Sequence, residues 1–252
     1  IVDSLVGSEM CIRDSMKMSI AIPTWGSYGK GDEFIEDLLR TIEIQSFKNF
    51  EVCISDHCKD DMVLEVVQKF SEKFEIKYLK NTKDYGNGPA NTNKAIDMCS
   101  GEVIKVMFQD DFFYDDESLE KIYTSLHASD RMWLLNGCNH TFDDGWNFVN
   151  EMNPRWNPNL LEGVNTISAP SVLAFKKGVT NRFDNNLTYF MDCEFYYGMY
   201  ERYGEPIYLN DCLITNRVGD FSVTTNVSHK NRDFYVEKET KYCKEKYDLI
   251  NA

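Results

Sequence analysis

Two adjacent carboxylates, Asp110 and Asp111, follow an apolar stretch at residues 102–108 (EVIKVMF). Neighbouring carboxylates repel each other unless a cation or solvent separates them. Oxygen ligands of this kind suit Mg²⁺ or Mn²⁺, which keep several waters and complete their coordination shell with substrate phosphates. The pair therefore predicts a divalent metal site. The alternative is a solvated loop whose acids cap the next helix.

A third acid with chemical potential, Asp192, lies in an aromatic segment at residues 189–203 (YFMDCEFYYGMYERY). Burial among aromatic rings would raise the pKa of this carboxyl toward the range in which a carboxylate is an effective general base. Aromatic residues at helical spacing more often belong to a core than to a site, so a packed helix with no chemical role is the alternative.

Two earlier apolar stretches also end in polar or aromatic side chains. Pro23, Thr24 and Trp25 close the first stretch, and Asp56 closes the second. A carboxylate at the end of a strand can accept a hydrogen bond from the imide N–H of a uracil or thymine ring, and Trp25 offers an aromatic face to a base. Each feature alone is equally consistent with a turn.

The elements that must position these residues alternate along the chain, which indicates strands feeding helices in a parallel sheet. The predicted strands are residues 18–23, 50–55, 75–79, 102–108, 168–177 and 206–209. The predicted helices are residues 33–45, 61–74, 90–99, 189–203 and 233–250. Residues 136–163, rich in Asn, Asp, Trp and Pro, predict a long functional loop. Because ligands bind at the carboxyl ends of parallel strands, the acids should meet at one edge.

The composition narrows the class of partner. The formal net charge of the 252 residues is -14, which argues against nucleic acid, because phosphate backbones bind clustered Lys and Arg. An anionic ligand would then need a metal or backbone amides. No apolar run reaches the ~20 residues of a spanning helix, and the eight cysteines form no C-x2-C pair. We therefore expect a cytoplasmic protein with free thiols and, at most, peripheral membrane contact.

Residues 1–15 (IVDSLVGSEMCIRDS) have neither the pattern of a signal peptide nor a periodic element. They resemble translated sequencing-adapter read-through, as found at the ends of metagenome-derived reading frames. We expect a non-native extension there and a single domain at residues 16–252, because no repeat or low-complexity linker marks a second one.

Taken together, the motifs resemble family 2 of the nucleotide-sugar glycosyltransferases. The matching segments are SIAIPTW, CISD, GPANTNKAIDMCSGEVIKVMFQDD, SAPSVLAFKK, MDCEFYYGMYERYG and NRVGDFSVT. The resemblance implies the α/β fold called GT-A, a Rossmann-like and mostly parallel central sheet flanked by helices. It also implies an inverting transfer of a sugar from a UDP-, dTDP- or GDP-sugar to a glycan or lipid-linked acceptor, in surface polysaccharide synthesis.

The resemblance also implies roles for individual residues. Asp192 matches the general base, and Asp110 with Asp111 would hold Mn²⁺ or Mg²⁺ against the diphosphate. The implied nucleotide pocket is lined by Pro23, Thr24, Trp25 and Asp56, with Asn93 nearby. Two positions depart from the family pattern: Phe108 replaces the first acid of Asp-x-Asp-Asp, and Arg217-Val218-Gly219 lacks the His of Arg-x-His, for which His229 is the substitute candidate.

Other function classes remain open at this point. The same fold could serve as a catalytically inactive module that binds sugar nucleotides or glycans. An acidic pair could also belong to a glycoside hydrolase, which would need no nucleotide. A nucleotidyltransferase would require a basic phosphate-binding loop that the sequence lacks.

Overall fold

The N-terminal half of the chain builds four parallel strands from alternating strands and helices. The computed structural model describes residues 18–142, 147–222, 225 and 231–248. The strands of this half are β1 (Met18–Thr24), β2 (Phe50–Asp56), β3 (Ile76–Lys80) and β4 (Val103–Val106). The helices between them are α1 (Gly31–Glu43), α2 (Met62–Phe70) and α3 (Gly88–Asp97). The predicted alternation is confirmed in this half.

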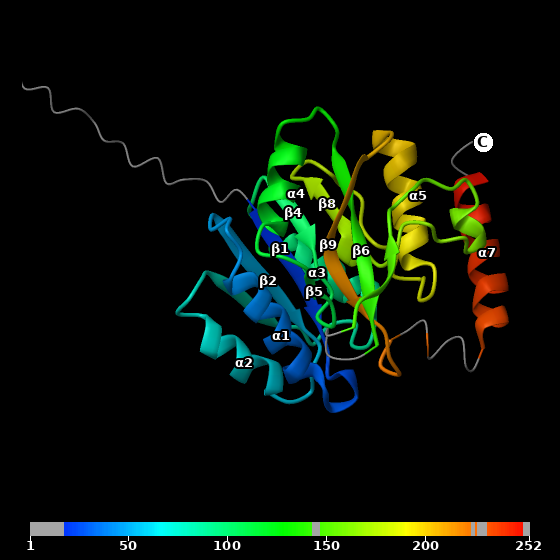
Figure 1. Ribbon diagram of the computed structural model, residues 1–252. Coiled ribbons are helices and arrows are strands. Elements are labelled where there is room, and N and C mark those ends of the chain that lie inside the picture. Colours follow the sequence, from blue (N-terminus) through cyan, green and yellow to red (C-terminus); the bar gives the residue numbers. More distant parts are fainter. Residues whose placement is uncertain (1–17, 143–146, 223–224, 226–230, 249–252) are drawn as a thin grey trace, which may run out of the picture.

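The C-terminal half extends the same sheet with mixed pairing (Figure 1). Its strands are β5 (Phe112–Phe113), β6 (Trp133–Thr141), β7 (Val149–Met152), β8 (Leu173–Lys176) and β9 (Ile207–Arg217). Its helices are α4 (Ser118–His127), α5 (Met191–Tyr203) and α7 (Arg232–Asp248). Short 3₁₀ turns are η1 (Ser27–Gly29), η2 (Leu160–Glu162) and η3 (Pro170–Val172). The strand order is β3-β2-β1-β4-β8-β6-β9-β5, and β7 pairs with β6.

One prediction about the C-terminal half is wrong, and one is confirmed with a longer extent. Residues 136–141 belong to the buried strand β6 and not to a loop. A strand that is covered on both faces shows no alternation of polar and apolar residues, so its period is hidden. The strand expected at residues 206–209 is the first part of β9, which continues to Arg217.

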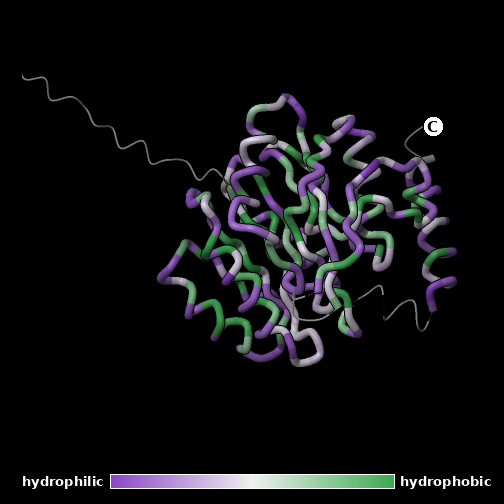
Figure 2. The backbone as a smooth tube through the Cα atoms, in the orientation of Figure 1, coloured by the Kyte–Doolittle hydropathy of each residue, from purple (hydrophilic) through white to green (hydrophobic). Residues whose placement is uncertain are grey.

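Helices flank the sheet and bury its apolar side chains in one continuous core. Helix α3 packs on β1 and β2, α4 packs on β4, β6, β8 and β9, and α1 packs on α2. Hydrophobic residues recur through the strands and the helices beside them, whereas α7 is mostly hydrophilic (Figure 2). The core thus fixes the ends of β1, β2 and β4, near which most of the predicted site residues lie, whereas Asn93 and Asp192 lie on α3 and α5.

Other expectations concern segments beyond the sheet. Residues 1–15 and His229 lie outside the described residues. Every cysteine in the described part of the chain is a free thiol. None of its described helices has the length and apolar character needed to cross a bilayer.

Candidate active site

The carboxyl ends of β1, β2 and β4 meet at one edge of the sheet. Thr24 and Asp56 are direct partners in the parallel register of β1 and β2, and Met107, just past β4, donates its N–H to the carbonyl of Ala21 at 3.0 Å. Parallel pairing therefore brings three chain segments to the same edge, as the sequence predicts.

Asp56 lies at this edge with its carboxylate fully buried. Its Oδ1 accepts from Thr24 Oγ1 at 3.0 Å and from the Cys58 N–H at 2.8 Å, and its Oδ2 accepts from Tyr78 Oη at 2.6 Å and from Lys80 Nζ at 3.2 Å. Burial by itself would raise the pKa of Asp56, but these hydrogen bonds outweigh it and lower that pKa. A contact between Asp56 and a nucleobase stays a prediction. A base that donates to this carboxylate would have to replace one of the four donors that already contact it.

Helix α3 contributes Asn91 to the same edge, a residue that the sequence did not single out. Asn91 Nδ2 donates to the carbonyl of Thr24 at 3.0 Å, and its Oδ1 accepts from Ser55 Oγ at 2.7 Å. Asn93 instead binds the backbone N–H and carbonyl of Phe183, at 2.8 and 2.7 Å. Residues two apart on a helix face different directions, so only one of the two asparagines reaches the strand ends.

Gln109 fixes the backbone of the predicted nucleotide loop. Its side-chain amide accepts from the Trp25 N–H and donates to the Trp25 carbonyl, both at 2.9 Å, and it also donates to Ser27 Oγ. Gln109 is buried, whereas the Trp25 ring is 42% exposed and packs edge-on against Tyr28. Ser27 and Tyr28 both have positive φ angles, a conformation that non-glycine residues adopt only when the surroundings hold it.

The acid pair follows directly after Gln109. Asp111 is 4% exposed, with its Oδ2 accepting from Asn216 Nδ2 at 2.9 Å and its Oδ1 accepting from the Arg217 N–H at 3.1 Å. Asp110 is half-buried. Burial and the charge of the neighbouring carboxylate raise the pKa of Asp110, and burial raises the pKa of Asp111 against its hydrogen bonds. The raised pKa values mean that ionising both neighbouring carboxylates is unfavourable, and a bound cation would stabilise their ionised forms.

The donor set fits a hard divalent cation. The part of the chain that the structure describes contains no cluster of three or more His, Cys, Asp or Glu side chains that could hold a metal. Mg²⁺ and Mn²⁺ are commonly held by one or two carboxylates plus water and substrate phosphates. Asp110 and Asp111 are the residues that would hold such an ion.

Asp192 opens helix α5. Its Oδ2 accepts from Asn165 Nδ2 at 2.7 Å, and its Oδ1 accepts from the Cys193 N–H at 2.7 Å. Burial raises the pKa of Asp192 to about 6, against the effect of these hydrogen bonds. The environment predicted for this acid is therefore present, with an asparagine partner that the sequence did not indicate.

A chain of hydrogen bonds joins Asp111 to Asp192 across the end of β9. Asn216 donates to Asp111 and accepts from Ser168 Oγ at 3.1 Å, and the Ser168 carbonyl accepts from Asn165 Nδ2 at 3.2 Å. Asn165 then donates to Asp192. Its Oδ1 also accepts from the Ser168 N–H at 3.0 Å, which holds Ser168 at a φ of 104°. The two acids, 81 positions apart in the sequence (192 − 111), therefore belong to one polar cluster.

A buried lysine lies behind the acid pair. Lys105 of β4 is fully buried and donates to Asn136 Oδ1 at 3.0 Å and to the Ser171 carbonyl. Burial lowers the pKa of Lys105 to about 7, and the charge of Asp111 opposes that shift. The run EVIKVMF predicts a buried strand, but the residue type alone does not show what would pair with the lysine.

Arg217 borders a hollow of about 460 Å³ whose lining includes Ser27, Tyr28 and Lys30. Its Nη2 donates to Asp37 Oδ2 at 3.0 Å, and its guanidinium lies 4.7 Å from the ring centre of Phe34. The side chain is 5% exposed, and Nε has no hydrogen-bond partner. From the sequence, Arg217 is identified only as part of a segment that departs from the family's Arg-x-His pattern. In the structure, its backbone N–H donates directly to Asp111.

Solved structures define the class of fold. The crystal structure of TarS residues 1–349 from Staphylococcus aureus in complex with UDP has a TM-score of 0.64 and is 20% identical, covering 81% of this chain and 61% of that one. The mannosyltransferase PcManGT from Pyrobaculum calidifontis, in complex with GDP-Man and Mn²⁺, has a TM-score of 0.61 and is 16% identical, covering 81% of this chain and 57% of that one. The chain has the GT-A fold of these glycosyltransferases, as predicted.

The family follows from the sequence match. The model of glycosyl transferase family 2 matches residues 19–165, more than half of the chain, which therefore belongs to this family. The poly(ribitol-phosphate) beta-N-acetylglucosaminyltransferase TarS of Staphylococcus aureus is 29% identical over 99 residues, covering 38% of this chain and 17% of the relative. The GalNAc(5)-diNAcBac-PP-undecaprenol beta-1,3-glucosyltransferase of Campylobacter jejuni is 34% identical over 112 residues, covering 44% of this chain and 33% of the relative. Neither match exceeds a third of the relative's length.

Proposed function

We propose that this chain transfers a sugar, with inversion, from a nucleotide diphosphate donor to a hydroxyl of a glycan or lipid-linked acceptor. The observation that carries the proposal is the hydrogen-bonded path from Asp111 to Asp192 through Asn216, Ser168 and Asn165. It supports a single site in which one acid faces the leaving group and another faces the acceptor, within a single GT-A domain.

The donor end of the site combines carboxylates with cations. In this proposal Asp110 and Asp111 hold Mg²⁺ or Mn²⁺, which when bound neutralises charge on the departing diphosphate. Lys30 and Arg217 line the neighbouring hollow together with Asp220, and Arg217 is paired with Asp37, so attraction of the anionic donor there would come mainly from Lys30. Trp25, held by Gln109, would offer its exposed face to the base of a UDP-, dTDP- or GDP-sugar.

The acceptor end depends on Asp192. The acceptor oxygen attacks the anomeric carbon while the bond from that carbon to the phosphate oxygen breaks, and its electron pair leaves with the diphosphate. The proton of the acceptor hydroxyl passes to the Asp192 carboxylate. A pKa of about 6 leaves Asp192 ionised at neutral pH and makes it a stronger base than an ordinary aspartate. One displacement of this kind inverts the anomeric configuration.

Donor binding and metal use can be tested together. We would measure thermal shifts and donor consumption with UDP-GlcNAc, UDP-Glc, dTDP-Glc and GDP-Man, each with Mn²⁺ and with EDTA. We expect one donor to raise the melting temperature only with the metal, because a ligand of the native state stabilises it. Asp111→Ala should weaken this binding by about 10-fold or more. Asp116→Ala, which removes an exposed acid of the following segment, is the matched control and should bind normally.

The outcomes separate the function classes. Binding without consumption in the presence of glycan acceptors would indicate an inactive binding module. Hydrolysis of a glycan without any nucleotide would indicate a glycoside hydrolase. Equal donor affinity with Mn²⁺ and with EDTA would contradict the metal-assisted transfer.

A further inference from the structure

The three residues that lead into helix α5, which carries Asp192, are held by a carboxylate from the distant helix α7. Glu239 accepts from three consecutive backbone N–H groups, those of Thr188 and Tyr189 at 3.0 Å and that of Phe190 at 2.8 Å. The Glu239 side chain is nearly inaccessible to solvent, with 2% of the residue exposed. A buried carboxylate with three N–H donors is a strong and directional anchor.

Helix α5 has no side-chain cap at its N-cap position, although Asp192 within its first turn accepts from the Cys193 N–H at 2.7 Å. The N-cap residue is Phe190, which has no oxygen in its side chain and makes no capping hydrogen bond. The N-terminus of a helix carries a partial positive charge, so a carboxylate placed there is favourable. Glu239 therefore does not replace an N-cap side chain, which would accept from the second or third helical N–H. It anchors the N-cap residue and the two residues before it, with its charge near the positive end of the helix.

Further contacts from α7 reach the same helix. Lys246 Nζ lies 2.7 Å from Asp184 Oδ2 and 2.8 Å from Glu194 Oε1. Tyr247 Oη donates to the same oxygen of Glu194 at 2.7 Å. Glu194 is buried and follows Asp192 by two residues, so α7 contacts α5 on both sides of Asp192 in the sequence.

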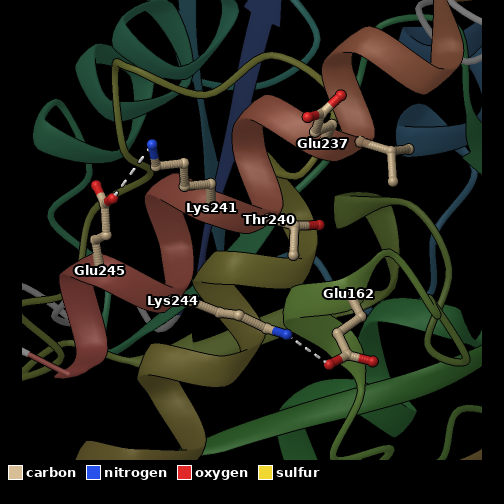
Figure 3. A pocket seen from close by; sticks show the side chains of 7 residues that line it. Glu162, Glu237, Thr240, Lys241, Lys244 and Glu245 are labelled. Atoms are coloured by element: carbon tan, nitrogen blue, oxygen red, sulfur yellow. Dashed lines mark hydrogen bonds and ion pairs between the residues drawn. The ribbon is translucent and has the colours of Figure 1, made fainter.

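The charged surface of α7 differs from this buried set. A groove of about 660 Å³ runs along α7 beside η2, and its acidic and basic side chains are drawn in Figure 3. The pairs Lys244–Glu162 and Lys241–Glu245 there are exposed, and exposed ion pairs contribute little to stability. The attachment of α7 to α5 therefore depends mainly on Glu239, Lys246 and Tyr247.

We propose that Glu239 is a positioning residue for Asp192, which fixes the first turn of α5 so that the Asp192 carboxylate stays in place beside Asn165. The inference rests on the proposed role of Asp192 as general base. Glu239 acts in it through the backbone of residues 188–190 and does not touch the substrate. A displacement of even 1 Å at a reacting group can lower a rate by about 100-fold.

The test compares Glu239→Gln with Glu237→Gln in the full chain. Glu237 is an exposed acid on the same helix, in the groove of Figure 3, so it controls for loss of charge. The isosteric Glu239→Gln places an NH₂ group against N–H donors. We expect kcat with UDP-GlcNAc, Mn²⁺ and a glycan acceptor to fall by about 10- to 100-fold, with the donor KM within twofold.

Two further readouts distinguish positioning from general damage. The acid limb of the kcat–pH profile should move to lower pH in Glu239→Gln, because a displaced Asp192 is better hydrated and its pKa falls. Amide hydrogen exchange of residues 188–194 should accelerate in Glu239→Gln and stay unchanged in Glu237→Gln. If the glutamine variant does not fold, Glu239→Asp, which keeps the charge on a shorter side chain, should show the same pattern.

Unchanged exchange at residues 188–194, or a kcat and pH profile matching those of Glu237→Gln, would overturn the inference. Its failure is distinguishable from failure of the proposed function. An active Asp192→Asn variant would remove Asp192 from the mechanism, whereas hydrogen exchange would still report whether Glu239 holds the start of α5. An inactive Asp192→Asn beside a fully active Glu239→Gln would reject the positioning role alone.

Discussion

Asp56 and Asp192 are the same side chain in two regions of the molecule with opposite electrostatic environments. Asp56, at the end of β2, receives four hydrogen bonds, and its pKa is lowered. Asp192, at the start of α5, accepts from Asn165 and the Cys193 N–H, but burial outweighs its hydrogen bonds and raises its pKa to about 6. The difference separates a carboxylate that is held ionised within a rigid strand end from one that can exchange a proton near neutral pH.

The same contrast extends to the two halves of the sheet. In the N-terminal half, Thr24 and Asp56 sit at strand ends fixed by parallel register, and partners of this pair include an adjacent strand and Asn91 of α3. In the C-terminal half, Asp192 accepts from Asn165 of a loop, and the segment that leads into its helix donates to Glu239 of α7. We therefore expect changes in the first half to affect stability and donor binding, and changes in the second to affect the chemical step.

The largest expected effect is on the rate of Asp192→Asn. An amide cannot accept the acceptor proton, so kcat should fall by roughly 10²-fold or more, with donor affinity nearly unchanged. Steady-state kinetics together with calorimetric titration of the donor would measure both. The Asp233→Asn variant, at an exposed acid in the first turn of α7, is the control. Wild-type activity in Asp192→Asn would remove the base from the mechanism.

The second effect concerns the stability of Asp56→Asn. Replacing the carboxylate leaves Tyr78, Lys80 or the Cys58 N–H without its charged acceptor, so we expect a loss of about 2–3 kcal/mol at pH 7. Because the folded-state pKa of Asp56 is lowered, its contribution is present above the unfolded value of 3.8 and disappears as pH falls through the folded value. Urea unfolding at pH 7 and at pH 3 measures this. An equal deficit at both pH values would contradict the assigned role of the charge.

The third prediction concerns Asp192, whose charge affects stability in the direction opposite to that of Asp56. The folded pKa of Asp192, about 6, lies above the unfolded value of 3.8, so the ionised group destabilises the native state above pH 6. Asp192→Asn should then be more stable than the wild type at pH 7.5, by on the order of 2 kcal/mol. The gain should shrink between about pH 6 and pH 4, which thermal unfolding across that range would follow. A variant that is less stable at pH 7.5 would show that burial is not the dominant influence on Asp192.

The smallest effect is predicted for Gln109→Leu, which removes both amide contacts to Trp25 while keeping a side chain of similar size. The Trp25 loop would lose its fixed conformation, so we expect the donor KM to rise by about 10-fold and kcat to change little. Steady-state kinetics over a range of donor concentrations distinguish the two parameters. A fall in kcat at constant KM would instead connect Gln109 to the chemical step.

The local part of this architecture could be predicted from the sequence. Apolar periodicity located β1, α1, β2 and α5, and the acids at the ends of apolar stretches fell at one edge of the sheet. These predictions are correct because the side-chain period of a strand or helix can be recognised in a short stretch of sequence, and parallel strands place their carboxyl ends at one edge. The pairing of β4 with β8, and of β6 with both β8 and β9, involved partners that no local pattern specifies.

The tertiary structure alone decided how the buried polar residues are satisfied. Asn136 lies in a strand that we expected to be a loop, because asparagine in a buried strand is unfavourable without a partner, and that partner is Lys105 on β4. Likewise, α5 has no side-chain cap at its N-cap position, and Glu239 of α7 anchors the segment that leads into it. The sequence by itself determined the elements and their polar ends, since these follow from neighbouring residues. Only folding determined which distant donor meets which acceptor, because a buried hydrogen bond depends on two segments that the linear order does not relate.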